Sequence, residues 1–219
     1  MKLTLSKKAI EALIINFEVS SKRNYDRRLQ RPIWPGGASG VTIGLGYDLG
    51  HQKPDDVRRD LDGLLTPEQI IALITACGVT GPRARTICNN LQHIVLLWDK
   101  ACVLFYKSSL PFYAKQTYRV YPDVVNIHPY EQTVFVGLVY NRGNALRDSS
   151  ANDRRREMRE LIAAIKADND KLMASLLRSM KRLWNDSQKG LILRREEEAK
   201  WVELADTPIP EDDKLEIDV

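Results

Sequence analysis

The segment GVTIGLGYDLG, residues 40–50, constrains the fold most, because it places four glycines between regularly spaced apolar residues. Such alternation is typical of a half-buried strand. Its apolar face would carry Val41, Ile43, Leu45, Tyr47 and Leu49, whereas the opposite face is mostly glycine with Thr42 and Asp48. Glycine weakens a strand, and it often marks a place where something approaches the backbone closely. We therefore predict a strand with a core-facing side and a glycine face that forms the floor of a site.

The remainder of the chain shows mainly helical periodicity. Ser6 is a predicted N-cap for a short helix with Glu18 at its end, whose apolar face comprises Ile10, Leu13, Ile14 and Phe17. In LTPEQIIALIT, Thr66, Pro67 and Gln69 predict a helix start with a capping box. Further helices are predicted near residues 91–107, 111–120, 129–141, 154–167, 169–183 and 190–204.

The composition is that of a globular protein, with 43% hydrophobic and 28% charged residues. No apolar run is long enough for a membrane span, and the charges near the start are too closely interleaved for a signal peptide. We expect synthesis in the cytoplasm. The three cysteines, Cys77, Cys88 and Cys102, show no CxxC spacing and have no histidine cluster beside them, which argues against a disulfide framework or a zinc site.

Charge is unevenly distributed along the chain. From Asp206 onward there are six acidic residues and one lysine, so the net charge of +4 for the whole chain leaves +9 for residues 1–205. A basic body suits a polyanionic partner, whether nucleic acid, anionic lipid or a cell-wall polymer. Charge alone therefore narrows the partner to a class.

The motifs exclude several kinds of chemistry. None of the three histidines, His51, His93 and His128, lies in an HExxH motif or beside a GxSxG elbow, and the glycine segment matches neither a Walker loop nor GxGxxG. The remaining candidates for catalytic residues are Glu18, at a helix end, and the pair Thr42 and Asp48. Cleavage of a glycosidic bond needs a proton donor and a second carboxylate, so this combination suits glycoside hydrolysis.

Four blocks, in order, resemble the phage lysozymes of glycoside hydrolase family 24. They are FE at residues 17–18, GVTIGLGYDLG, VFVGLVYNRGNAL and KGLILRREEEAKW, and the resemblance spans roughly residues 6–204. It implies an α+β, mainly α, lysozyme-like fold in one domain, residues 1–205, followed by an acidic tail, residues 206–219. The small β-hairpin lobe would cover about 15–65 and the helical lobe about 66–205, with the N-terminal helix packing on the latter.

The resemblance implies a peptidoglycan muramidase that cuts the β-1,4 bond between N-acetylmuramic acid and N-acetylglucosamine. Glu18 would be the general acid, and Thr42 would help to hold the attacking water. In the phage enzymes the catalytic aspartate precedes the TIGxG block, where this chain has only Asp26. The pesticin-like lysozyme domain is more similar, because its aspartate follows the threonine by the interval between Thr42 and Asp48. We therefore favour Asp48 over Asp26.

This assignment requires a bend in the glycine segment. Six residues of extended strand would separate Thr42 from Asp48 by about 20 Å, too far to share one water. Gly44 and Gly46 permit a turn between them. If the chain follows its relatives and inverts the anomeric centre, the two carboxyl groups should lie roughly 6.5–9.5 Å apart rather than about 5 Å.

The resemblance also implies residues that contact substrate. Arg194 aligns with a basic residue near the catalytic glutamate, although a pair with Glu198 within its own helix is an equal alternative. Asn141 could bind an acetamido group or the water, or simply end its helix. Trp34 and Tyr47 could stack on sugar rings, but the apolar face of the strand favours a core position for Tyr47.

The muramidase interpretation requires no metal or cofactor, and we expect a monomer that binds peptidoglycan glycan strands rather than nucleic acid and does not insert into membranes. The alternatives are a lytic transglycosylase, which works with the glutamate alone, and a non-catalytic wall-binding protein. A nucleic-acid binder ranks third. The enzyme would act on the cell wall, in the periplasm, as a phage endolysin or as a secreted antibacterial toxin with an immunity protein.

Overall fold

The computed structural model describes all residues, 1–219. Helices account for 62% of the chain and the strands are few and short, so the predicted α+β, mainly α, class is confirmed. The chain divides into two compact units. The inserted unit is Glu18–Leu110, and the terminal unit combines Met1–Phe17 with Pro111–Val219.

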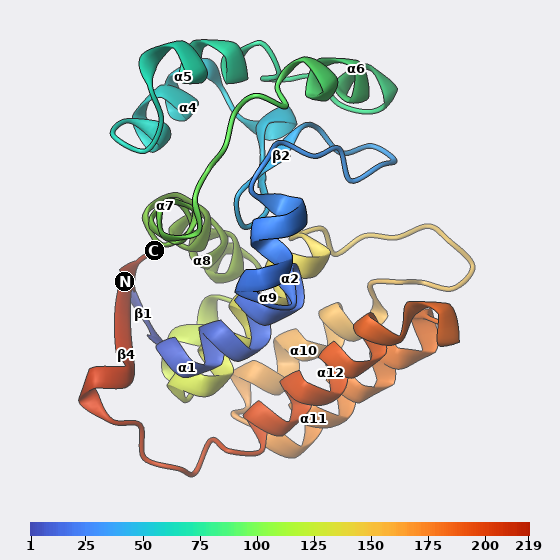
Figure 1. The fold of residues 1–219 in the computed structure, drawn as a ribbon. Helices are drawn as coiled ribbons and strands as arrows, with labels where there is room; N and C mark the ends of the chain where they lie inside the picture. The colour runs from blue at the N-terminus through green and yellow to red at the C-terminus, as the bar shows by residue number, and fades with distance from the viewer. The chain divides into compact units, whose positions relative to one another are not determined.

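The terminal unit is built mainly from helices. Its elements are β1 (Lys2–Ser6), α1 (Lys7–Ile10), the π-helical η1 (Glu11–Ile15), η5 (Pro122–Asn126), α9 (Pro129–Arg142), α10 (Arg156–Lys166), α11 (Asp170–Ser179), η6 (Met180–Leu183), η7 (Asp186–Gln188), α12 (Lys189–Val202), η8 (Glu211–Asp213) and β4 (Lys214–Asp218). Helices α2 (Asn16–Val19) and α8 (Leu110–Val120) cross the unit boundaries. The neighbouring helices α10, α11 and α12 pack side by side (Figure 1).

Helix α9 forms the centre of this unit. Its residues from Tyr130 to Val139 are all buried, and it contacts β1, α1 and α12. A helix that is apolar on nearly every side is stable only when other elements surround it. Ile14 of η1 packs against Gly137 of this helix.

The acidic C-terminal segment, expected as a tail, is part of the terminal unit. Strand β4 pairs antiparallel with β1, from Lys2 opposite Asp218 to Ser6 opposite Lys214 (Figure 1). Asp213 is buried and accepts hydrogen bonds from Ser6 Oγ at 2.6 Å and from the Lys8 amide at 2.9 Å. Ser6 also caps α1, as predicted, by accepting from the Ala9 amide.

The inserted unit contains the short hairpin and a series of short helices. Its elements are α3 (Lys22–Asn24), η2 (Tyr25–Leu29), β2 (Thr42–Ile43), β3 (Tyr47–Asp48), η3 (Leu49–His51), α4 (Pro54–Leu61), α5 (Pro67–Ile74), α6 (Pro82–Asn90), α7 (Trp98–Leu104) and η4 (Phe105–Ser109). The predicted capping box of Thr66 and Gln69 is confirmed at the start of α5.

The inserted unit ends at Leu110, whereas the sequence predicts that the small lobe ends near residue 65. The reason lies in the packing. Gly44 of the hairpin turn lies against Leu96, Ala101 and Leu104, so the hairpin and α7 belong together. The N-terminal residues 1–17 fall within the terminal unit.

Three helix predictions need correction. Helices α4 and α6 occupy stretches for which the sequence predicts no helix, and each is short and begins with proline. The helix predicted from residue 91 begins only at Trp98. The buried apolar residues before it follow an irregular backbone, in which the Leu96 amide donates to the Gln30 carbonyl at 2.8 Å.

Candidate functional site

The glycine segment folds into a hairpin. Thr42 lies opposite Asp48 and Ile43 lies opposite Tyr47, with a turn in which Gly44 and Gly46 have φ angles of 60° and 83°. Only glycine adopts such angles without strain. The continuous strand predicted for residues 40–50 is therefore wrong, but the required bend is present. It makes Thr42 and Asp48 direct cross-strand neighbours, a relation in which Cβ atoms lie about 4.5–5.5 Å apart.

Gly40 and Gly50 contact each other rather than leaving an open surface. A Cβ on Gly40 would lie 2.4 Å from the Gly50 nitrogen and 2.3 Å from Asp48 Oδ1. A Cβ on Gly50 would lie 2.8 Å from both the Gly40 Cα and the Val79 carbonyl oxygen. The interpretation of the glycine face as the floor of a site is corrected here, because the atoms that approach these two glycines belong to the chain itself.

Backbone amides hold the Asp48 carboxylate. Oδ1 accepts from the Gly50 amide at 2.8 Å, Oδ2 accepts from the Gly40 amide at 3.1 Å, and His51 Nε2 lies 3.8 Å from Oδ2. The side chain keeps 23% of its surface exposed. Asp48 is therefore fixed in orientation while part of its side chain stays accessible. The bond from the Gly50 amide also makes Asp48 the N-cap of η3.

Glu18 occupies the helix end that the sequence predicts. It is half-buried in the last turn of α2, and Ser20, with φ of 62°, follows the end of the helix. Glu18, Thr42 and Asp48 all belong to the inserted unit. Asp26 belongs to it too, but it is exposed and forms an ion pair with Lys22 at 2.6 Å. A surface ion pair explains Asp26 without a catalytic role.

The two aromatic candidates differ in exposure. Tyr47 is only 4% exposed and its hydroxyl donates to Asp60 Oδ2 at 2.9 Å, so the suggested stacking of Tyr47 on a sugar is corrected to a core position. Burial and the Asp60 carboxylate raise the Tyr47 pKa. Trp34 is half-buried, and its indole donates to the Ser39 carbonyl at 3.0 Å. Part of the Trp34 surface thus remains exposed.

Arg194 lies in the interior of the terminal unit. It is 2% exposed, its Nε lies 3.3 Å from Glu198 Oε1, and it donates to the Gly137 carbonyl at 3.2 Å. The alternative of a pair within α12 is therefore present. Arg195, fully buried beside it, shares the Glu198 oxygen at 2.5 Å. Burial lowers the pKa of Arg195 to about 10 and raises that of Glu198.

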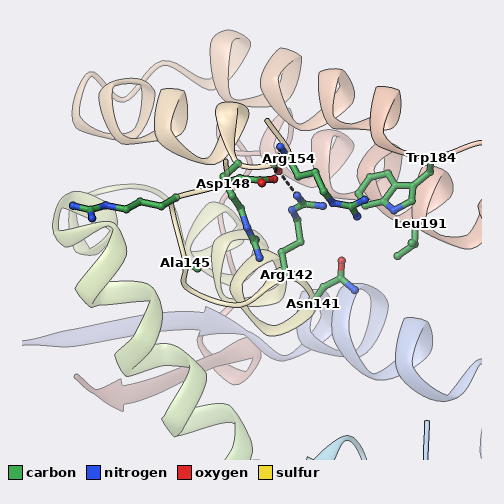
Figure 2. A pocket seen from close by; sticks show the side chains of 9 residues that line it. Asn141, Arg142, Ala145, Asp148, Arg154, Trp184 and Leu191 are labelled. Atoms are coloured by element: carbon green, nitrogen blue, oxygen red, sulfur yellow. Dashed lines mark hydrogen bonds between the residues drawn. The ribbon is translucent and has the colours of Figure 1, made fainter. Parts of the chain in front are cut away.

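Asn141 lies at the end of α9, where Gly143 with φ of 73° terminates the helix. Its side-chain oxygen accepts from Arg195 at 3.3 Å. It also borders a cavity of about 460 Å³ in the terminal unit (Figure 2). The other lining residues are Arg142, Ala145, Arg147, Asp148, Arg154, Arg155, Trp184 and Leu191. Our sequence analysis missed this arginine group, although the segment DRRR at residues 153–156 is a signal for it.

A group of acids in the terminal unit was also missed. Oxygen atoms of Glu131, Asp168 and Asp170 lie within 4.8 Å of one another, an arrangement that could hold a hard cation. Burial and the charge of Asp170 raise the pKa of Glu131 to about 8. These residues are separate in sequence and unit from Glu18, Thr42 and Asp48.

A comparison with family models gives one match, described as "Domain of unknown function (DUF8812)", over residues 15–135. The match includes the whole inserted unit, with Glu18, Thr42 and Asp48, but ends before Asn141 and Arg194. A search of curated proteins gives no match. None of the helices has the length and apolar character needed to span a bilayer.

Proposed function

The chain belongs to the family of domains of unknown function DUF8812, and we propose that it is a peptidoglycan muramidase. In this proposal it hydrolyses the β-1,4 bond between N-acetylmuramic acid and N-acetylglucosamine. The family description carries no activity, so support comes from the residues. It consists of the four ordered sequence blocks and the local geometry of the inserted unit.

The hairpin is the observation that carries this proposal. A catalytic pair of Thr42 and Asp48 requires that two residues six positions apart meet, and the turn at Gly44 and Gly46 brings them opposite each other. The amides of Gly40 and Gly50 then fix the carboxylate. A base that activates water benefits from a fixed orientation, because misplacement of the reacting groups costs rate steeply.

The proposed reaction uses two carboxyl groups in different roles. Glu18 donates a proton to the glycosidic oxygen as the bond to the anomeric carbon breaks. A water held by Thr42 attacks that carbon, and Asp48 accepts the proton that the water loses. The products are a new reducing end and a free hydroxyl group on the next sugar. Delivery to the wall, as endolysin or as secreted toxin, stays a prediction.

Digestion of purified peptidoglycan tests the proposal. Wild type, Glu18→Gln and Asp48→Asn would be incubated with sacculi, and the released fragments analysed by mass spectrometry. We expect reducing N-acetylmuramic acid ends from wild type, and a loss of at least about 100-fold in rate for each variant, since general acid–base groups contribute about 10²–10⁴-fold. Anhydro-muramoyl ends that persist in Asp48→Asn would instead identify a transglycosylase.

Matched variants separate catalysis from structure. Glu11→Gln changes an exposed glutamate that precedes Glu18 in the same helical stretch, and Asp26→Asn changes the competing aspartate. Both should retain wild-type rates. Asp48→Asn also turns an amide group toward a backbone N–H donor, so its thermal unfolding must be recorded at the assay temperature. If the wild-type protein bound sacculi but released no fragments, it would be a wall-binding protein and not an enzyme.

A further inference from the structure

The cavity beside Asn141 has an unbalanced charge. Four arginines line it, Arg142, Arg147, Arg154 and Arg155, against one acid, Asp148. Arg147 and Arg154 are exposed, and neither forms an ion pair within the protein. With these groups ionised, the lining carries a net charge of +3. Its volume of about 460 Å³ is within the range of small-molecule sites.

Arg142 lies among several other arginines at this cavity. Its guanidinium donates to the Arg154 carbonyl and lies 5.2 Å above the Trp184 ring, while its buried Nε has no hydrogen-bond partner. Burial and the neighbouring Arg155, Arg195 and Arg154 lower the pKa of Arg142 to about 10. Like charges held close together repel, and an anion bound in the cavity would offset that repulsion.

The single acid in the lining is already engaged by its own loop. The two oxygens of Asp148 accept from the amides of Ser150 and Arg154, each at 2.8 Å. The loop is held in turn by Arg159, which donates to the Leu146 carbonyl at 2.9 Å, and by Arg182, which donates to the Asn152 carbonyl at 2.7 Å. Arg147, Arg154 and Arg155 are thus presented by an anchored loop, while Arg142 ends α9. Figure 2 shows Arg142, Arg154 and Asp148 grouped near one another at the cavity.

We propose that this cavity binds a small oxyanion that carries at least two negative charges. Planar guanidinium groups match the geometry of phosphate and carboxylate oxygens, and four of them line this cavity without forming an ion pair. Trp184 and Leu191 add an apolar wall. The shared chemistry is a phosphoryl group or a set of carboxylates on one molecule. This inference does not rest on the muramidase proposal.

Calorimetric titration of the full chain tests the site with two probes. Inorganic pyrophosphate represents the phosphoryl source and citrate represents the carboxylate source, each in 150 mM NaCl. We expect saturable binding of at least one probe at one site per chain. Arg147→Gln/Arg154→Gln should weaken it by about tenfold or more, since a hydrogen bond to a charged group contributes about 1.5–3 kcal/mol.

The control is Arg83→Gln/Arg85→Gln, which removes the same charge from two exposed arginines of α6 in the inserted unit. It should bind as wild type does, within twofold. Pyrophosphate alone, citrate alone, or both would each support the site and identify its preferred source. No saturable binding, or equal weakening in both double variants, would overturn the proposal. The single variant Arg147→Gln provides the same comparison should the double variant not fold.

Discussion

Charged side chains are held in two different ways, by backbone amides at Asp48 and by one another around Glu198. In the inserted unit, the half-buried Asp48 is held by backbone amides that two glycines bring close. In the terminal unit, buried charged side chains depend mainly on one another, and four atoms remain without a hydrogen-bond partner: Glu131 Oε1, Arg142 Nε, Arg195 Nε and Glu198 Oε2. Backbone donors cannot move or titrate, whereas side-chain partners can do both. We therefore expect the surroundings of Asp48 to be sensitive to shape, and the buried charges of the terminal unit to be sensitive to charge and pH.

Among the changes considered, removal of the Glu198 carboxylate should lower the free energy of unfolding most. Glu198 is fully buried and is shared by Arg194 and Arg195, so Glu198→Ala leaves Arg195 as a buried cation without its acid. Breaking a buried pair in this way costs about 3–5 kcal/mol. Urea unfolding would measure it. Glu197→Ala, which affects an exposed pair with Lys200, should change the free energy of unfolding by less than about 0.5 kcal/mol. If Glu198→Ala and Glu197→Ala lowered the free energy of unfolding equally, the burial of the Glu198 cluster would not matter for stability.

Gly40→Ala tests whether shape dominates in the inserted unit. The new Cβ would meet backbone atoms of Gly50, which cannot turn aside, and overpacking of this kind costs about 1–3 kcal/mol. Gly190→Ala is the matched control, because nothing lies within 4 Å of the added atom and alanine favours the helix by up to about 1 kcal/mol. Thermal unfolding should therefore shift in opposite directions. An unchanged Gly40→Ala protein would contradict the contact between the two glycines.

The pH dependence of stability should distinguish the terminal unit. Glu131 has its pKa raised from 4.5 to about 8, so the folded protein holds this proton more tightly than the unfolded chain does. Its contribution to stability is complete below pH 4.5 and is lost as the pH rises through about 8. The free energy of unfolding should therefore fall as the pH rises from about 4.5 to about 8.

Glu131→Gln should remove this part of the slope, because its amide does not titrate and its oxygen can still accept from the His128 amide. Urea unfolding at several values between pH 5 and 8 would measure the slope. Glu160→Gln, on an exposed position of α10, should leave it unchanged. Parallel slopes for wild type and Glu131→Gln would assign the titration to another group.

The smallest change in the free energy of unfolding is expected for substitution of Asp26. Its ion pair with Lys22 is exposed on both sides, so Asp26→Asn should change the free energy of unfolding by at most about 0.5 kcal/mol. Chemical unfolding would show whether this surface carboxylate matters. A loss comparable to that of Glu198→Ala would mean that side-chain pairs on the inserted unit are as costly as those inside the terminal unit.

Features set by neighbouring residues could be predicted from the sequence. The caps at Ser6 and Thr66 and the helix end at Glu18 depend on a few consecutive positions, and each is confirmed. The meeting of Thr42 and Asp48 could be predicted as a requirement, because glycines lie between them. What a pattern cannot specify is which atoms approach a glycine. The contact between Gly40 and Gly50 exists only once the hairpin has closed.

Features that join distant residues could not be predicted. Leu3 pairs with Ile217, and no local signal in either strand identifies the other. Arg194 reads as a surface or site residue within a charged helix, yet it is buried because α9 and Phe17 lie against it. Short helices such as α4 have too few residues for their periodicity to stand out.

The division of the terminal unit into two stretches of chain has a consequence for how the protein is made. Residues 1–17 leave the ribosome before the inserted unit, but β1 has no strand partner until β4 has been synthesised. At about 5–20 residues per second, that interval is roughly 10–40 s. The inserted unit is complete well before then. We therefore expect the inserted unit to fold during synthesis. The apolar segment of residues 1–17 stays unpaired for longer and is more exposed to aggregation in that time.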